Sequence, residues 1–136
     1  MVESVVPHPQ SQAAALRLAI LLAGTGTLHF ATPKPFDAIV PPALPGRARY
    51  YTYASGVAEL AVAGALAVPR TRRVGGLAAA AVFVAVFPAN VQMAADWLRR
   101  TDLPSVAKVA AVARLPLQVP LVTQALAASR RAPHRL

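Results

Sequence analysis

Four long apolar runs, separated by polar or proline-rich segments, organise this chain. They cover residues 13–31, 50–68, 74–95 and 106–128. Each run has roughly the 20 residues that an α-helix needs to cross about 30 Å of hydrocarbon. Transmembrane β-strands are about half as long and alternate apolar with polar residues. The pattern therefore predicts an all-α fold: a four-helix transmembrane bundle that forms a single integral membrane domain.

The segments between and around the runs predict loops and tails. Residues 32–49 carry prolines that forbid a continuous helix, so we expect a structured loop with a short interfacial segment near 36–40. Residues 69–73, "PRTRR", predict a tight basic turn. The polar stretches 1–12 and 129–136 predict flexible tails. No suitable cleavage site follows the first run, so we interpret it as a retained helix rather than a signal peptide.

Composition supports a lipid environment. The chain is 56% hydrophobic and 14% charged, whereas soluble domains are roughly 45–50% apolar and about 25% charged. Its net charge of +9 comes from arginines gathered between the apolar runs, a distribution that fits membrane topology better than a nucleic-acid-binding face. The chain has no cysteine, which excludes disulfides, iron–sulfur clusters and zinc–thiolate sites within it.

Charge near the helix ends also predicts orientation. An even number of spans places both termini on the same side as the turn at 69–73. Seven basic residues fall on that side and six on the other, and Asp37, Asp96 and Asp102 all fall on the other side. We therefore expect both termini in the cytoplasm.

One carboxylate, Glu59, lies near the middle of the second apolar run. An ionisable group at membrane depth costs several kcal/mol unless it is paired or neutralised. Ser55 and Gly56 precede it by four and three residues and share its helix face. Because small residues let a second helix approach closely, this face is predicted to point into the bundle.

Several polar residues on the other runs lie at a similar depth. Arg114 lies about two turns into the fourth run, and Gln118 is one turn further on the same face. Asn90 on the third run and His29 near the end of the first belong to the same half of the membrane. The predicted polar site therefore comprises His29, Ser55, Glu59, Asn90, Arg114 and Gln118.

This constellation has three interpretations. Glu59 and Arg114 form a structural ion pair that fixes helix packing, or they belong to a binding or proton-handling site, or Glu59 snorkels toward lipid. The histidines at positions 8 and 134 are in the tails, so no metal site with His29 is expected. No motif for hydrolases, nucleotide binding or metalloproteases is present, and no catalytic residue is predicted.

Three stretches together resemble the DoxX-like family of small bacterial membrane proteins. "SGVAELAVAGALAVPRTRRVGG" is similar to that family's second helix, basic turn and third-helix start. "HFATPKPFDAIVPP" looks like its loop after the first helix, and "VFPANVQMA" like the end of its third helix. The resemblance implies a four-helix transmembrane bundle in the bacterial plasma membrane. It also implies a link to redox systems, because the family is named for a subunit associated with thiosulfate:quinone oxidation.

The expected function is that of a non-catalytic subunit or accessory protein of a membrane redox system, without a covalently bound cofactor. A quinone- or lipid-sized pocket centred on the polar site is part of this expectation, and so are a redox partner protein and a homo-oligomer. One alternative is a small oligomeric transporter or channel component. Another is a structural scaffold whose cytoplasmic turn, with Arg70, Arg72 and Arg73, binds anionic lipid.

Overall fold

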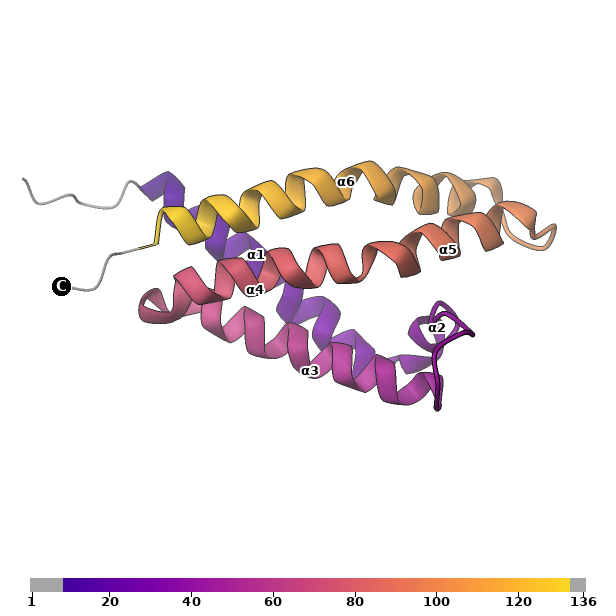
Figure 1. The fold of residues 1–136 in the computed structure, drawn as a ribbon. Helices are drawn as coiled ribbons and strands as arrows, with labels where there is room; N and C mark the ends of the chain where they lie inside the picture. The colour runs from indigo at the N-terminus through magenta and orange to yellow at the C-terminus, as the bar shows by residue number, and fades with distance from the viewer. Residues whose placement is uncertain (1–8, 133–136) are drawn as a thin grey trace, which may run out of the picture.

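The computed structural model describes residues 9–132, with side chains from residue 12 onward. This part of the chain consists of helices and short loops, with no strand. The elements in chain order are α1 (Pro9–Ala31), α2 (Pro33–Asp37), α3 (Ala48–Ala67), a 3₁₀ turn η1 (Pro69–Thr71), α4 (Arg72–Ala85), α5 (Phe87–Arg99) and α6 (Ser105–Arg130) (Figure 1). The predicted all-α class is confirmed for these residues.

The long helices pack in a fixed order of neighbours. α1 packs against α3, α3 against α4, and α4 against α6, while α5 packs against α6 and α1 also contacts α6. The start of α1, η1 and the end of α6 lie at one end of the molecule, which we call the basic end (Figure 1). α2 and the loop between α5 and α6 lie at the opposite end, toward which the α1–α3 pair and the α5–α6 pair diverge.

Prolines set several helix boundaries. α3 ends at Ala67 because Pro69 restricts the preceding Val68 to extended backbone, with φ −87° and ψ 119°. Pro88 lacks an amide hydrogen and its ring crowds the carbonyl one turn earlier, so the helical run breaks at Val86 into α4 and α5. The single helix predicted over 74–95 is therefore two helices.

The tails and the first loop are more helical than predicted. Within the described residues α1 is helical from Pro9 onward. Residues 9–12 and 129–130 are thus helical, and residues 1–8 and 133–136 lie outside the described part of the chain. The loop at 32–49 contains α2, which starts earlier than the interfacial segment predicted near 36–40.

Small residues allow the helices to approach closely. The main core cluster lies where α1, α3, α4 and α6 meet and consists of Ala15, Leu18, Ala19, Leu22, Val62, Ala63, Leu66, Ala79, Ala80, Phe83, Ala125 and Ala128. A Cβ added at Gly76 would stand 2.7 Å from the Ala125 carbonyl oxygen on α6, so only glycine fits there. A smaller cluster, formed by Met93, Ala94 and Ala111, joins α5 to α6.

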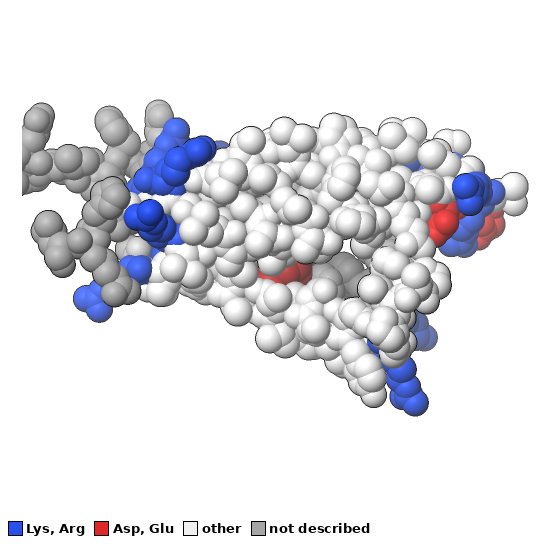
Figure 2. Space-filling model, in the orientation of Figure 1, with Lys and Arg blue, Asp and Glu red and all other residues white. Residues whose placement is uncertain are grey.

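The outer flank of the molecule is apolar. Large aliphatic side chains are widely exposed, with 74% of Ile20, 77% of Val106 and 66% of Val119 open to the surroundings. Figure 2 shows an almost uncharged flank between ends that carry blue basic groups. Exposing this much apolar surface to water would be unfavourable, so the flank fits a lipid environment.

In the described part of the chain, three helical stretches are long and apolar enough to cross a membrane. They are Gln12–Ala31, Pro69–Arg99 and Ser105–Arg130. Three of the four predicted spans therefore have the length and composition of membrane-spanning segments. The remaining helix, α3, has 20 residues and carries Glu59, and it is not among the three.

Candidate functional site

His29 and Glu59 meet where α1 packs against α3. His29 lies in the last turn of α1 and Glu59 near the middle of α3. The His29 Nδ1 atom is 3.1 Å from Glu59 Oε2, and the two side chains are only 11% and 12% exposed. Glycines at the crossing make this approach possible, because a Cβ at Gly26 would stand 3.2 Å from Glu59 Cβ and one at Gly56 would stand 2.9 Å from His29 Cβ.

The hydrogen bonds of His29 fix where its proton lies. Nδ1 is 2.7 Å from the Thr25 carbonyl oxygen, which can only accept, so Nδ1 carries a hydrogen and donates it there. That donation leaves Glu59 Oε2 close to the imidazole without a hydrogen-bond partner in the described part of the chain. A buried carboxylate oxygen without a donor is costly, so this atom is the natural place for a ligand hydroxyl or a proton.

A short helix covers the histidine. The Phe36 ring of α2 stacks on the His29 imidazole, with centroids 3.8 Å apart and planes 23° from parallel. The sequence predicts an interfacial segment beginning near Phe36, but sequence reasoning did not include Phe36 among the site residues. The signal that could have indicated it is its place beside the prolines of "TPKPF", close after His29 in the chain.

Asp37 holds α2 in this position. Its carboxylate accepts hydrogen bonds from the Thr52 hydroxyl at 2.6 Å and from Arg49 Nε at 2.8 Å, and both donors belong to α3. The hydrogen bond from Thr52 lowers the pKa of the Asp37 carboxyl below its usual range, with the Arg49 guanidinium adding to this effect against partial desolvation. Asp37 therefore stays ionised and attached to α3 at neutral pH.

Asn90 and Gln118 are buried polar residues on the other helix pair. Asn90 on α5 is 2% exposed and Gln118 on α6 is 6% exposed. Asn90 Nδ2 and Gln118 Oε1 have no hydrogen-bond partner among the described residues. α5 and α6 pack on each other, whereas α3 packs against α1, α2 and α4. The two amides thus belong to an interface different from the one that holds His29 and Glu59.

One of the three interpretations, an ion pair between Glu59 and Arg114, is not formed in the structure. Arg114 is an exposed residue of α6, and Glu59 contacts His29 instead. Arg114 acts on the carboxylate only as a more distant charge. The interpretation was wrong because it rested on the similar membrane depth of Glu59 and Arg114. In the structure α3 and α6 are not packing partners, since α3 packs against α1, α2 and α4. Ser55 lies one turn before Glu59 on α3 and is half-buried.

The basic turn also differs from its predicted role at one position. Arg72 is 4% exposed and donates from Nε to the Leu66 carbonyl at 2.8 Å and from Nη2 to the Ala67 carbonyl at 3.1 Å. It therefore satisfies carbonyls left free at the end of α3 and is not available to lipid. Arg70 and Arg73 are exposed.

Comparison with known proteins identifies the family but no activity. Residues 18–129 match the family model described as "Domain of unknown function (DUF8561)". The match covers most of the chain, so the protein belongs to this family. No curated protein and no solved structure matches the sequence.

Proposed function

We propose that this DUF8561 protein is a non-catalytic accessory subunit of a membrane redox system that binds a quinone-like lipid at the His29–Glu59 site. The resemblance of three sequence stretches to the DoxX-like family supports the redox association. In this proposal a partner protein performs the electron transfer, and this chain binds and orients the ligand.

The proposal includes four membrane spans, with α3 as the fourth. A helix of 20 residues is about 30 Å long, which matches the hydrocarbon thickness. Glu59 lowers the apolar character of α3, and a carboxylate that faces another helix is tolerated inside a bundle. With four spans the basic end, which holds the start of α1, η1 and the end of α6, faces the cytoplasm of a bacterial cell.

The observation that carries the proposal is the unpartnered Glu59 Oε2 atom beside His29 Nδ1. A quinone, when bound, supplies ring oxygens that gain or lose protons together with electrons. The Glu59 carboxylate accepts a hydrogen bond from a quinol hydroxyl, and its protonated form donates one to a quinone carbonyl. The Glu59 carboxylate can exchange a proton with the bound ligand directly, while His29 keeps its Nδ1 hydrogen on the Thr25 carbonyl. Phe36 on the imidazole limits access of water.

Ligand-induced thermal stabilisation in detergent tests this function. We expect a soluble quinone analogue to raise the melting temperature of the wild-type protein, and Glu59→Gln to abolish the shift while preserving the fold. Asp96→Asn is the matched control, because Asp96 is an exposed carboxylate of α5, and it should keep the full shift. An equal shift in Glu59→Gln, or none in the wild type, would contradict quinone binding at this site.

A transport role is the second candidate, and the helix breaks favour it. The α4–α5 run is interrupted at Val86, and α6 contains Pro116 and Pro120 beside the buried Gln118. Interrupted helices with buried polar groups are typical of substrate pathways in transporters. The protein would need to oligomerise to enclose such a pathway. Proteoliposome flux that is lost in Gln118→Ala would support transport, and unchanged flux would count against it.

A further inference from the structure

We propose that a groove between the start of α1 and the end of α6 binds the phosphate group of an anionic membrane lipid. The groove has a volume of about 640 Å³ and is lined by Ala13, Ala14, Arg17, Thr123, Gln124, Ala127 and Arg131. This volume falls within the range of about 300–1,000 Å³ found for small-molecule sites. The groove lies at the basic end, away from His29 in the last turn of α1 and from Phe36 in α2. It is therefore a site separate from the one proposed for quinone.

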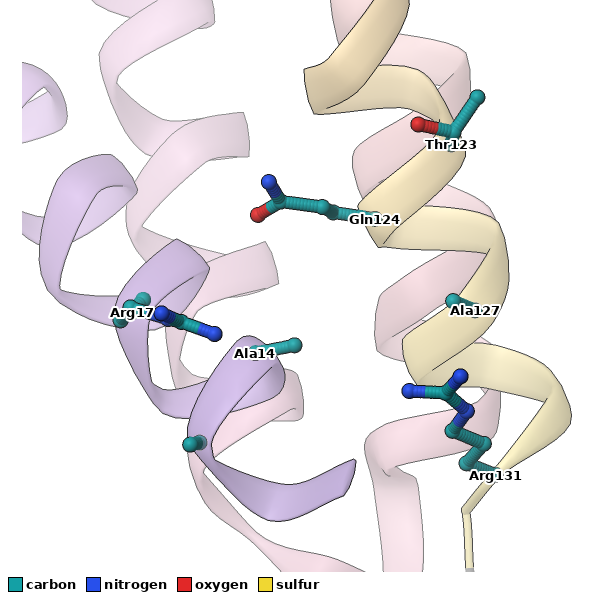
Figure 3. Close-up of a pocket in the computed structure, with 7 residues that line it drawn as sticks. Ala14, Arg17, Thr123, Gln124, Ala127 and Arg131 are labelled. Carbon is teal, nitrogen blue, oxygen red and sulfur yellow. The ribbon is translucent and has the colours of Figure 1, made fainter. Parts of the chain in front are cut away.

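The polar side chains of the groove point into it from both helices. Figure 3 shows Arg17 on α1 extending toward α6, and Gln124 and Arg131 extending from α6 toward α1. Two guanidinium groups that converge on one space can hold a phosphate through paired charge-assisted hydrogen bonds. Among the described residues, no carboxylate lies within salt-bridge distance of Arg17 or Arg131. Within the described residues, therefore, no salt bridge neutralises the charge of these two guanidinium groups.

The apolar surroundings of the groove favour a lipid over a free phosphate ion. Its walls between the polar groups are alanines of α1 and α6. Toward the middle of the molecule, Ile20 follows Arg17 by about one turn of α1 and is 74% exposed. Leu117 lies two turns before Gln124 on α6 and is 57% exposed. A lipid with its phosphate at the arginines can lay its acyl chains along this surface.

The charge distribution of the described residues agrees with an anionic lipid. Arg70, Arg73 and Arg130 are exposed at the same end as the groove, and the described acidic residues lie elsewhere, in α2, α3, α5 and the loop before α6. Figure 2 shows blue groups without red ones at this end, and both colours at the opposite end. Basic residues near a membrane surface are attracted to anionic lipids, which brings such lipids to the groove.

Lipid titration of the delipidated full-length protein, followed by native mass spectrometry, tests the groove. Phosphatidylglycerol should bind the wild type in preference to phosphatidylcholine. The double variant Arg17→Gln/Arg131→Gln should bind it about tenfold more weakly, as expected for the loss of two charge-assisted contacts. The matched control Arg70→Gln/Arg73→Gln removes the same charge at the same end but outside the groove, and should change affinity by only about twofold.

Any of four results would overturn the proposal. Equal weakening in both double variants would mean that diffuse charge, and not the groove, attracts lipid. Equal binding of phosphatidylcholine would remove the role of the anionic headgroup, and equal thermal stabilisation by inorganic phosphate would make a free anion the ligand. If the groove variant fails to fold by circular dichroism, Gln124→Leu keeps the charge and should still weaken phosphatidylglycerol binding, whereas unchanged binding would overturn the proposal. None of these results depends on whether Glu59 binds quinone.

Discussion

At the scale of single residues, Asp37 makes the attachment of α2 dependent on pH. Its pKa is lowered by the hydrogen bond from Thr52 and by Arg49, so the ionised form is favoured in the folded state. A depressed folded-state pKa gives a stabilisation that is complete above the unfolded pKa of about 3.9 and is lost as pH falls through the folded value. We expect protection of residues 33–47 from hydrogen exchange to be constant near neutral pH and to fall in acid.

The substitution Asp37→Asn isolates this contact at neutral pH. It should increase hydrogen exchange in α2 and leave α4, α5 and α6 unaffected, because only the attachment of α2 to α3 is weakened. Asp96→Asn is the control, since Asp96 is exposed and forms no salt bridge among the described residues. Unchanged exchange of residues 33–47 in Asp37→Asn would show that the stack of Phe36 on His29 is sufficient to hold α2.

A second residue-scale prediction concerns the end of α3. Arg72→Ala removes two hydrogen bonds from a buried guanidinium and leaves the Leu66 and Ala67 carbonyls without donors. We expect a loss of about 2–4 kcal/mol in the free energy of unfolding. The neighbouring exposed Arg73→Ala should cost no more than about 0.5 kcal/mol. Reversible unfolding in detergent micelles measures both, and equal effects would refute the capping role of Arg72.

At the scale of helices, two glycines differ in whether helix packing or helix propensity decides the effect of replacing them with alanine. Gly76 faces the backbone of α6, and an added Cβ would stand 2.7 Å from the Ser129 nitrogen. Gly76→Ala should therefore destabilise the protein by about 1–3 kcal/mol. A Cβ at Gly64 on α3 would meet nothing within 4 Å, so Gly64→Ala should stabilise by about 0.5–1 kcal/mol through helix propensity. The same unfolding assay tests the pair, and a stabilising Gly76→Ala would contradict the packing of α4 on α6.

The helices themselves were largely predictable, but their rotations were not. Apolar runs of the right length give α1, α3 and α6, and the prolines give most of their ends. The break at Val86 was missed, because hydropathy continues through Pro88 while the backbone does not. The polar residues of α6 are spread around the helix, so its sequence does not indicate which side is buried. The sequence therefore did not distinguish Gln118, which is buried, from Arg114, which was also expected to face the interior and is exposed.

At the scale of the whole molecule, the central question is whether α3 crosses the membrane. Its packing against both α1 and α4, which belong to stretches with the length and composition of spans, places it beside helices that would cross the bilayer. A surface helix would instead need its polar residues on one side. If α3 spans, the loop at 32–49 and the loop between α5 and α6 lie on the same side. If it does not, these loops lie on opposite sides.

Single-cysteine labelling separates these cases, because the chain has no cysteine of its own. Ala43→Cys and Thr101→Cys place one reporter in each loop, and both positions are exposed. With four spans and the basic end in the cytoplasm, a membrane-impermeant maleimide should label both reporters in intact cells. Thr71→Cys in η1 should react only after the cells are permeabilised. Labelling of Ala43→Cys and Thr71→Cys from the same side would mean that α3 does not cross, and the four-span arrangement included in the proposed function would then be wrong.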